Sequence, residues 1–374
     1  MTLNWSIKLF ICALLLSSCV GKQTLSSQGE GDTVRFQYAK LLNLVRHEGY
    51  TVATISHPWR QDAVLHQYVL VPSDSALPET LPDGTMIRTP LRRSVVFTTV
   101  HCSLLSMLHR EQHVAGVADL KYIKAPYVHD GVQKGRIMDC GDGMSPVIEK
   151  IIDLHPDALL LSPFENSGGY GQLEEIDIPI VECAEYMEPT PLGRAEWVRF
   201  YGMLFGCEHE ADSLFAIVDS SYNALKTLTD NRQKPRVNID KITGSVWYVP
   251  GGRSTIGQML ADAGADYPWA QDEHSGSVAL PFETVLERAG ECDIWLLRYS
   301  GQQPLTRQQL LSEHRGYHQF RAFNNRQVYG CNVEQSLFYE ESPFRPDLLL
   351  SDFIRIMHPD ALPHHVLRYY HPVE

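Results

Sequence analysis

The chain has 374 residues, 44% of them hydrophobic, which is enough for one large domain or two medium ones. Asp and Glu outnumber Lys and Arg by 45 to 32, which gives a formal net charge of −13. This balance argues against nucleic-acid binding, which needs clustered basic residues, but it permits a small anionic ligand held by a few buried arginines.

The first feature along the chain is an apolar run at residues 9–16, preceded by Lys8. It is far shorter than the roughly 20 apolar residues of a membrane-spanning helix and is typical of a signal peptide. The run ends in Leu16-Ser17-Ser18-Cys19, which resembles a bacterial lipobox. We therefore expect a signal peptide at 1–18, a lipid anchor on Cys19 and a flexible tether at 19–33. The alternative is an ordinary cleaved signal peptide that happens to contain Cys19.

The cysteines beyond this leader show no C-x-x-C pair and no Cys/His cluster with zinc spacing, so we expect no metal site. Several end apolar runs, which is typical of small buried hydrophobic residues. Export would permit disulfides, but the sequence does not pair them. These cysteines are Cys102, Cys140, Cys183, Cys207, Cys292 and Cys331.

Residues 34–90 form an N-terminal strand extension and loop. Alternating runs at 50–55 and 67–71 predict antiparallel strands, and the prolines of 72–90 predict a loop. Residues 91–191 then alternate between strands and helices, as in an α/β lobe. We expect buried strands at 94–99, 114–117, 158–161 and 178–181, and helices at 101–110 and 146–154, the latter starting at Pro146.

Residues 192–232 are predicted to be helical, with a break at Gly206, and to connect two lobes. A second α/β lobe at 233–374 has predicted strands at 246–249, 294–297 and 327–330. Its predicted helices lie at 254–263, 281–289, 306–311 and 346–357. The segments 146–161 and 281–297 repeat one pattern: a proline, a helix, an Asp and a buried strand. This repeat predicts two similar lobes with a cleft between them.

At this point several segments resemble substrate-binding proteins of ABC importers for iron complexes and vitamin B12, in a branch like that of Bacteroidetes. The resemblance covers about residues 92–362 and rests on Gly116-Val117-Ala118-Asp119, 142–159, Ile178-Pro179-Ile180-Val181, 249–265, 323–329 and 345–359. It implies an α/β fold of class III periplasmic-binding type, with two Rossmann-like lobes joined by a long rigid helix and extra N-terminal β strands. It also implies a monomer that delivers a ligand to permease and ATPase subunits. In this family an exposed Glu on each lobe contacts the permease; Glu165 is a rough match, and Asp262 is the nearest acid in the second lobe.

Ligands of open α/β sheets bind at the carboxyl ends of the strands, so residues there are the candidates for ligand binding. The first-lobe candidates are Thr99, His101, Tyr122, Tyr127 and Tyr170, and the second-lobe candidates are Trp247, Tyr248, Arg253, Arg298, Tyr299, Phe338, Tyr339 and Arg345. Trp247 and Tyr248 alternate on one strand, so only one of them can face the cleft. Arg298 follows an apolar run and is either salt-bridged within the protein or aimed at an anion. Arg253 at a Gly-rich helix start is either an anion site or a solvated side chain. His101 contacts a metal or heme, or simply makes hydrogen bonds in a loop.

Aromatic and arginine side chains suit a flat, anionic metal chelate. We therefore expect a lipid-anchored periplasmic binding protein for a ferric siderophore, with cobalamin and then heme as alternatives. A direct zinc- or manganese-binding protein is less favoured because the chain lacks a His-rich acidic loop. Neither a G-x-S-x-G nor an H-E-x-x-H motif is present, so we predict no enzyme, no catalytic residue and no cofactor.

Overall fold

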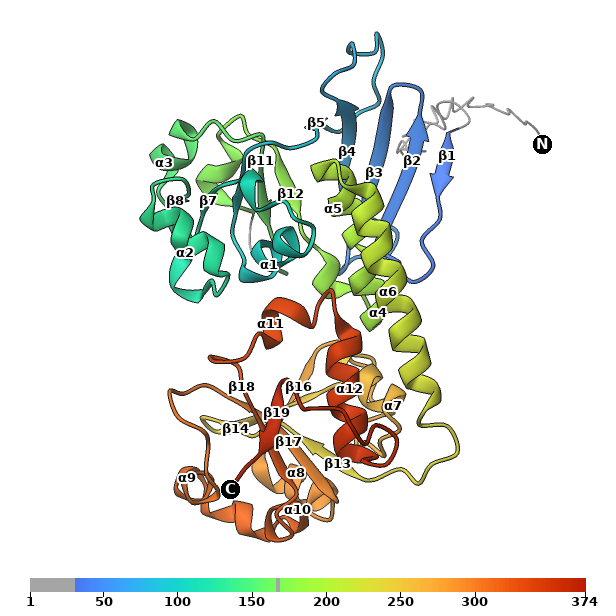
Figure 1. The fold of residues 1–374 in the computed structure, drawn as a ribbon, viewed down its shortest axis with the longest axis vertical. Helices are drawn as coiled ribbons and strands as arrows, with labels where there is room; N and C mark the ends of the chain where they lie inside the picture. Colours follow the sequence, from blue (N-terminus) through green and yellow to red (C-terminus); the bar gives the residue numbers. More distant parts are fainter. Residues whose placement is uncertain (1–30, 166–168) are drawn as a thin grey trace, which may run out of the picture. The chain divides into compact units, whose positions relative to one another are not determined.

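The computed structural model describes residues 31–165 and 169–374 (Figure 1). The predicted signal peptide, Cys19 and most of the tether lie outside these residues. Asp32 and Thr33, at the end of the expected tether, already belong to a strand. In the described part of the chain, every helix is too short or too polar to cross a membrane.

The N-terminal extension is a five-stranded sheet in the order β1-β2-β3-β4-β5. Both predicted strands are present, and β5 is an addition inside the expected loop, where it pairs in parallel with β4. The sequence did not predict β5 because prolines lie on either side of its short alternating run, an arrangement that is typical of a loop. The strands are β1 (Asp32–Val34), β2 (Leu42–His47), β3 (Tyr50–Ser56), β4 (Val64–Pro72) and β5 (Thr85–Thr89).

The first lobe is a parallel sheet in the order β12-β11-β6-β7-β8. All four predicted strands are present, but the strand predicted at 94–99 ends at Val96, because Thr98 caps α1 by accepting a hydrogen bond from the His101 backbone. Pro146 does not start a helix, since it lies in a two-stranded ribbon and α3 begins at Ile148. The strands are β6 (Ser94–Val96), β7 (Val114–Val117), β8 (Met138–Asp139), β9 (Gly141–Asp142), β10 (Ser145–Pro146), β11 (Ala158–Leu161) and β12 (Ile180–Glu182); the helices are α1 (Thr99–Met107), α2 (Pro126–Gln133) and α3 (Ile148–Asp153).

Three helices connect the lobes: α4 (Pro191–Glu196), α5 (Val198–Phe205) and α6 (Glu208–Thr227). The predicted break is present, because Gly206 ends α5 in the left-handed region with φ +62°. The 20 residues of α6 span about 30 Å.

Two buried carboxylates join the extension to this connector. Glu196 accepts hydrogen bonds from the backbone N–H groups of residues 37–39, at 2.7–2.9 Å. Glu188 accepts those of residues 40 and 41, at 2.9–3.0 Å. The extension is therefore attached to the connecting segment through consecutive main-chain amides.

The second lobe has a sheet in the order β13-β17-β18-β19, parallel except for β19. The strand predicted at 246–249 belongs instead to a small antiparallel sheet, β14-β15-β16. The strands are β13 (Val237–Ile239), β14 (Ile242–Thr243), β15 (Val246–Pro250), β16 (Ser277–Leu280), β17 (Ile294–Tyr299), β18 (Val328–Asn332) and β19 (Tyr370–Pro372). The helices are α7 (Thr255–Asp262), α8 (Phe282–Ala289), α9 (Arg307–Glu313), α10 (Arg321–Asn324), α11 (Phe338–Glu341) and α12 (Pro346–Met357).

The internal repeat has a structural role at the aspartates. Asp157 precedes β11 and accepts hydrogen bonds from the backbone N–H groups of Arg92 and Arg93, just before the neighbouring strand β6. Asp293 precedes β17 and accepts the N–H of Arg236, just before its neighbour β13. Each acid therefore fixes the start of the adjacent strand in its own lobe.

All cysteines in the described residues are buried free thiols, as expected for small hydrophobic residues. Burial raises the pKa of the Cys102 and Cys292 thiols to about 12.

Candidate functional site

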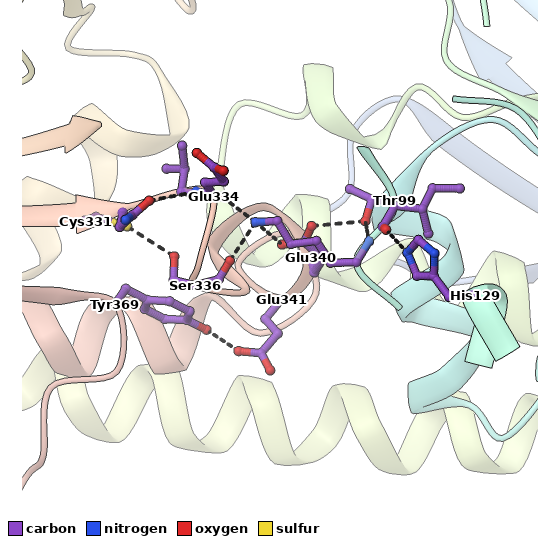
Figure 2. A network of polar contacts seen from close by, with 12 residues as sticks. Thr99, His129, Cys331, Glu334, Ser336, Glu340, Glu341 and Tyr369 are labelled. Atoms are coloured by element: carbon purple, nitrogen blue, oxygen red, sulfur yellow. Dashed lines mark hydrogen bonds and ion pairs between the residues drawn. The ribbon is translucent and has the colours of Figure 1, made fainter. Parts of the chain in front are cut away.

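The carboxyl ends of the strands in the two lobes meet at a direct polar contact (Figure 2). Thr99, which follows β6, donates from Oγ1 to Oε1 of Glu340 on α11, at 3.0 Å. Lys124, which follows β7, donates from Nζ to the carbonyl oxygens of Ser336, at 2.8 Å, and of Val333. Since 333–340 follows β18, the ligand-binding edges expected for both sheets face each other.

Glu340 is the buried centre of this contact. Lys124 Nζ lies 3.9 Å from its Oε2, and that oxygen has no hydrogen-bond partner among the described residues. Burying a carboxylate is costly unless it is paired, so Thr99 and Lys124 both stabilise its charge. We name Thr99, Lys124 and Glu340 the interlobe contact.

On the second-lobe side, a pocket of about 260 Å³ opens at the carboxyl ends of β13 and β17, beside β14 and β15 of the small antiparallel sheet. It brings together four predicted ligand residues, Tyr248, Arg298, Tyr299 and Tyr339. The whole lining is Asp240, Lys241, Thr243, Tyr248, Arg298, Tyr299, Ser300, Val333 and Tyr339. We call it the second-lobe pocket.

Both cations of the second-lobe pocket already have partners within the protein. Arg298 forms a two-pronged pair with Asp240, with Nε–Oδ1 at 2.9 Å and Nη2–Oδ2 at 2.5 Å. Burial lowers the pKa of Arg298, but hydrogen bonding to Asp240 outweighs it and raises the pKa above its ordinary value. Lys241 pairs with Glu313 at 2.5 Å. Of the two alternatives for Arg298, the structure therefore has the internal salt bridge.

The aromatic side chains are the accessible part of the second-lobe pocket. Tyr248 is 48% exposed and Tyr339 is 45% exposed. Their rings offer stacking faces, whereas Trp247, the neighbour of Tyr248 on β15, points into the core. The pocket is therefore better suited to a ligand with a flat face that can stack on these rings than to a strongly charged anion.

On the first-lobe side, a pocket of about 450 Å³ lies at the ends of β11 and β12. It contains the predicted ligand residue Tyr170 and the predicted docking residue Glu165. The hydroxyl of Tyr170 donates to the carboxylate of Glu182. The whole lining is His57, Trp59, Arg60, Leu65, Pro163, Phe164, Glu165, Gly169, Tyr170, Glu174 and Glu182. We call it the first-lobe pocket.

Two further first-lobe candidates, Tyr122 and Tyr127, lie outside the first-lobe pocket. Tyr122 follows β7 and is 65% exposed, with Lys121 Nζ 4.8 Å from its ring centre. Tyr127 uses its hydroxyl within the lobe, as a donor to the carbonyl oxygen of Cys102 at 3.0 Å.

His101 is a buried structural residue and not a cleft residue. Its Nε2 lies 3.0 Å from the Tyr201 hydroxyl and 3.2 Å from Glu185 Oε1. Burial lowers the pKa of His101, but the charges and hydrogen bonds of Cys183 and Glu185 outweigh it and raise the pKa to about 10. The prediction that His101 reaches a metal or heme is wrong, because Tyr201 of the connector covers it.

Four second-lobe candidates also lie outside the second-lobe pocket. Trp247 is fully buried, stacked 5.7 Å from Trp295, and donates from Nε1 to the carbonyl oxygen of Ile239. Phe338 is buried beneath Arg298, whose guanidinium lies 5.9 Å from its ring centre. Arg345 makes a two-pronged pair with Asp347, and Arg253 is an exposed side chain paired with Glu273 at 2.9 Å.

Asp262 differs from the expected docking acid as well. It is buried, accepts a hydrogen bond from the Tyr222 hydroxyl and pairs with Lys226, both at 2.8 Å. An acid that is already paired beneath the connecting helix α6 is not an exposed contact for a permease. Glu165, by contrast, is exposed and stays a prediction.

Asp240 and Lys241 are the main residues that sequence reasoning missed. They directly follow β13, a strand of three residues that the sequence pattern did not reveal because Lys234, Pro235 and Arg236 precede it. The rule that selected Arg298 would have selected them too, once that strand was recognised. In the described ranges, no group of three or more His, Cys, Asp or Glu side chains is placed to hold a metal ion.

Comparisons with known proteins identify the family of this chain. The sequence profile of the family described as periplasmic binding protein matches residues 96–334. A lipoprotein of Methanocaldococcus jannaschii, named as uncharacterized, is 26% identical over 349 residues, covering 87% of this chain and 82% of the relative.

Solved structures share the fold at low identity. The molybdate periplasmic binding protein MolA of Haemophilus influenzae has a TM-score of 0.59 at 16% identity and covers 75% of this chain and 90% of its own. A structure from Saccharomonospora viridis, described as an ABC-type Fe3+-hydroxamate transport system, has a TM-score of 0.55 at 19% identity and covers 72% and 94%. With the profile match spanning more than half of its length, this chain belongs to the periplasmic binding protein family.

Proposed function

We propose that this protein is the lipid-anchored substrate-binding component of an ABC importer. It captures an iron chelate, a ferric siderophore, at the facing edges of its two lobes and delivers it to the permease and ATPase subunits. The observation that carries this proposal is the second-lobe pocket, in which Tyr248 of β15 and Tyr339 of α11 gather with Arg298 and Tyr299 at the carboxyl end of β17. Membership of the binding-protein family supports the same reading.

The choice of ligand class rests on the chemistry of this pocket. Half-exposed tyrosine rings favour a chelate with flat or aromatic ligand groups. Because Asp240 and Glu313 balance Arg298 and Lys241, the pocket does not demand a strongly anionic ligand. Cobalamin and heme, which also present large flat faces, are the alternatives. The neighbours titled for molybdate and for Fe3+-hydroxamate transport illustrate how different the ligands on this fold can be.

Isothermal titration calorimetry tests the proposal. The full chain is titrated with ferric siderophores of the hydroxamate and catecholate classes, cyanocobalamin and heme. We expect submicromolar binding of one ferric siderophore class and at least tenfold weaker binding by Tyr339→Ala. Arg253→Ala, an exposed side chain outside the pocket, is the matched control and should bind normally. Binding only of cyanocobalamin or heme would replace the iron chelate by that ligand, and binding of none would overturn the metal-chelate assignment.

The anchor part of the proposal rests on the lipobox-like segment ending in Cys19 and on the relative that is named a lipoprotein. Together they support a periplasmic protein tethered to a membrane surface by lipid.

A further inference from the structure

The first-lobe pocket has one wall that the binding-protein family profile does not include. Pro163, Phe164 and Tyr170 come from the loop after β11, within the matched residues 96–334. The opposite wall, His57, Trp59, Arg60 and Leu65, belongs to the extension, at the end of β3, the turn that follows it and the start of β4. The extension therefore completes a cavity at the ligand-binding edge of the first lobe.

This wall is fixed in place by specific contacts. Tyr68 of β4 is fully buried, donates to the carbonyl oxygen of Ile180 at 2.9 Å and accepts the N–H of Glu182 at 2.8 Å. In the turn, Arg60 donates from Nε to His57 Nε2 at 3.0 Å, and the Trp59 ring stands edge-on to His57 at 5.7 Å. The two walls therefore keep a fixed relation, as preorganised binding requires.

The charges lining the first-lobe pocket are mainly negative. Glu165, Glu174 and Glu182 line it, against the single guanidinium of Arg60. Partial burial and the neighbouring Arg60 lower the pKa of His57, which disfavours its charged form. Glu182 is only 8% exposed, and its burial is partly compensated by the Tyr170 hydroxyl.

The rings lining the same pocket complement these carboxylates. Trp59, Phe164 and Tyr170 contribute three aromatic side chains, one from the extension and two from the first lobe. Ring faces attract cations, most strongly those of Trp, and a buried carboxylate gains from a positive charge placed beside it. An organic ammonium group satisfies both kinds of side chain at once.

We infer that the first-lobe pocket binds a positively charged organic ammonium group and that the N-terminal extension confers this selectivity. The group is either part of the transported chelate or a separate small ligand. The first possibility rests on the proposed function; the charge selectivity of the pocket does not.

The direct test compares choline with its uncharged isostere 3,3-dimethylbutan-1-ol, titrated into the full chain by calorimetry at constant ionic strength. We expect choline to bind at least tenfold more tightly. Glu165→Gln and Trp59→Ala, both at positions that are not buried, should each reduce this preference at least threefold. Glu175→Gln, an exposed acid outside the pocket lining, is the matched control and should leave the preference unchanged. Equal binding of the two probes, or an unchanged preference in both pocket variants, would overturn the inference.

A second experiment identifies the source of the charge. The probes are the ferric complex of a linear trihydroxamate with a free terminal amine and the same complex with that amine acetylated. Tighter binding of the free amine, lost in Glu165→Gln, supports an ammonium group on the cargo. Choline selectivity with equal binding of both complexes supports a separate ligand. Choline selectivity without binding of any chelate would keep this inference and overturn the proposed function. Chelate binding without any preference for charged probes would keep the proposed function and overturn this inference.

Discussion

Arg298 and Asp240 bind each other through two parallel hydrogen bonds in the lining of the second-lobe pocket, although 58 positions separate them in the sequence. Arg298 ends β17 and Asp240 follows the neighbouring strand β13, so strand pairing brings the two side chains together. The pair gives the pocket lining a fixed polar part, and each charge is compensated by the other.

Arg298→Ala should lower the free energy of unfolding by about 1–3 kcal/mol, because it leaves the largely buried Asp240 carboxylate without its partner. The double variant Arg298→Ala/Asp240→Ala should recover part of that loss. Urea unfolding of the single and double variants measures this coupling. Strictly additive effects would show that the pair contributes little to stability.

Substitutions of two adjacent residues of β15 should affect different properties, one the stability of the fold and the other ligand binding. Trp247→Ala removes a fully buried ring and should cost about 3–5 kcal/mol of unfolding free energy. Tyr248→Ala should change stability by no more than about 0.5 kcal/mol but weaken ligand binding roughly tenfold, through the loss of a stacking face. Thermal unfolding and calorimetry on both variants check this. Normal ligand affinity in Tyr248→Ala would remove that residue from the binding site.

Lys124→Met should loosen the interlobe contact, because among the described residues Glu340 then keeps only the Thr99 hydroxyl as a side-chain partner. We expect faster hydrogen exchange in 336–341, by about tenfold, with little change elsewhere. Lys121→Met is the control, since Lys121 forms an exposed pair with Asp142 at 3.6 Å. Unchanged exchange in Lys124→Met would mean that backbone packing alone holds α11 in position.

The His101–Glu185 pair should make stability depend on pH. Interactions with Cys183 and Glu185 raise the pKa of buried His101 from 6.5 to about 10. The contribution of the charged His101 to stability is therefore complete below pH 6.5 and is lost as pH rises toward 10. His101 and Arg194 lower the pKa of buried Glu185 from 4.5 to about 2, so its contribution is lost as pH falls through that range. The pair therefore stabilises the fold most between about pH 4.5 and 6.5.

Denaturant unfolding between pH 4 and 10 measures this dependence. The decline above pH 6.5 should flatten in His101→Gln and persist in His209→Gln, a change at an exposed position of α6. Identical profiles for the two variants would contradict a charged His101.

Cys19→Ala should move the protein from the membrane fraction to the soluble fraction. Acyl chains contribute about 0.8 kcal/mol per buried CH₂, so two or three chains hold a protein at a membrane almost irreversibly. Fractionation followed by immunoblotting measures the distribution. If the variant still fractionates with membranes, the lipid anchor is not on Cys19.

The sequence was sufficient to predict the two lobes and the connecting helices. Buried parallel strands are recognisable as continuous apolar runs, and a glycine marks the break between α5 and α6. It could not reveal β13 or β5, whose few residues carry too little periodicity. The pairing of β19 with β18 depends on residues more than 35 positions apart, which no local pattern encodes.

Prediction of the candidate site was limited by partners distant in the sequence. The position of Arg298 at a strand end followed from the sequence, but the identity of its partner did not. Alternation on β15 indicated that one of Trp247 and Tyr248 faces the cleft, yet only the packing of Trp295 decides which. His101 and Asp262 are satisfied by Tyr201 and Tyr222 of the connecting helices, and the sequence does not show those contacts.

The attachment of residues 37–41 to Glu188 and Glu196 has an evolutionary consequence. The donors from this segment to these two acids are main-chain amides, so this part of the joint depends on the path of the backbone. Tyr38 adds a side-chain contact, since its hydroxyl donates to Asp219 of α6 at 2.7 Å and its ring packs against Phe215. Substitutions at the exposed positions Gln37 and Lys40 can therefore accumulate without detaching the extension, provided that neither introduces proline, which lacks the N–H. An extension joined in this way can diversify at such positions while the two lobes stay the same.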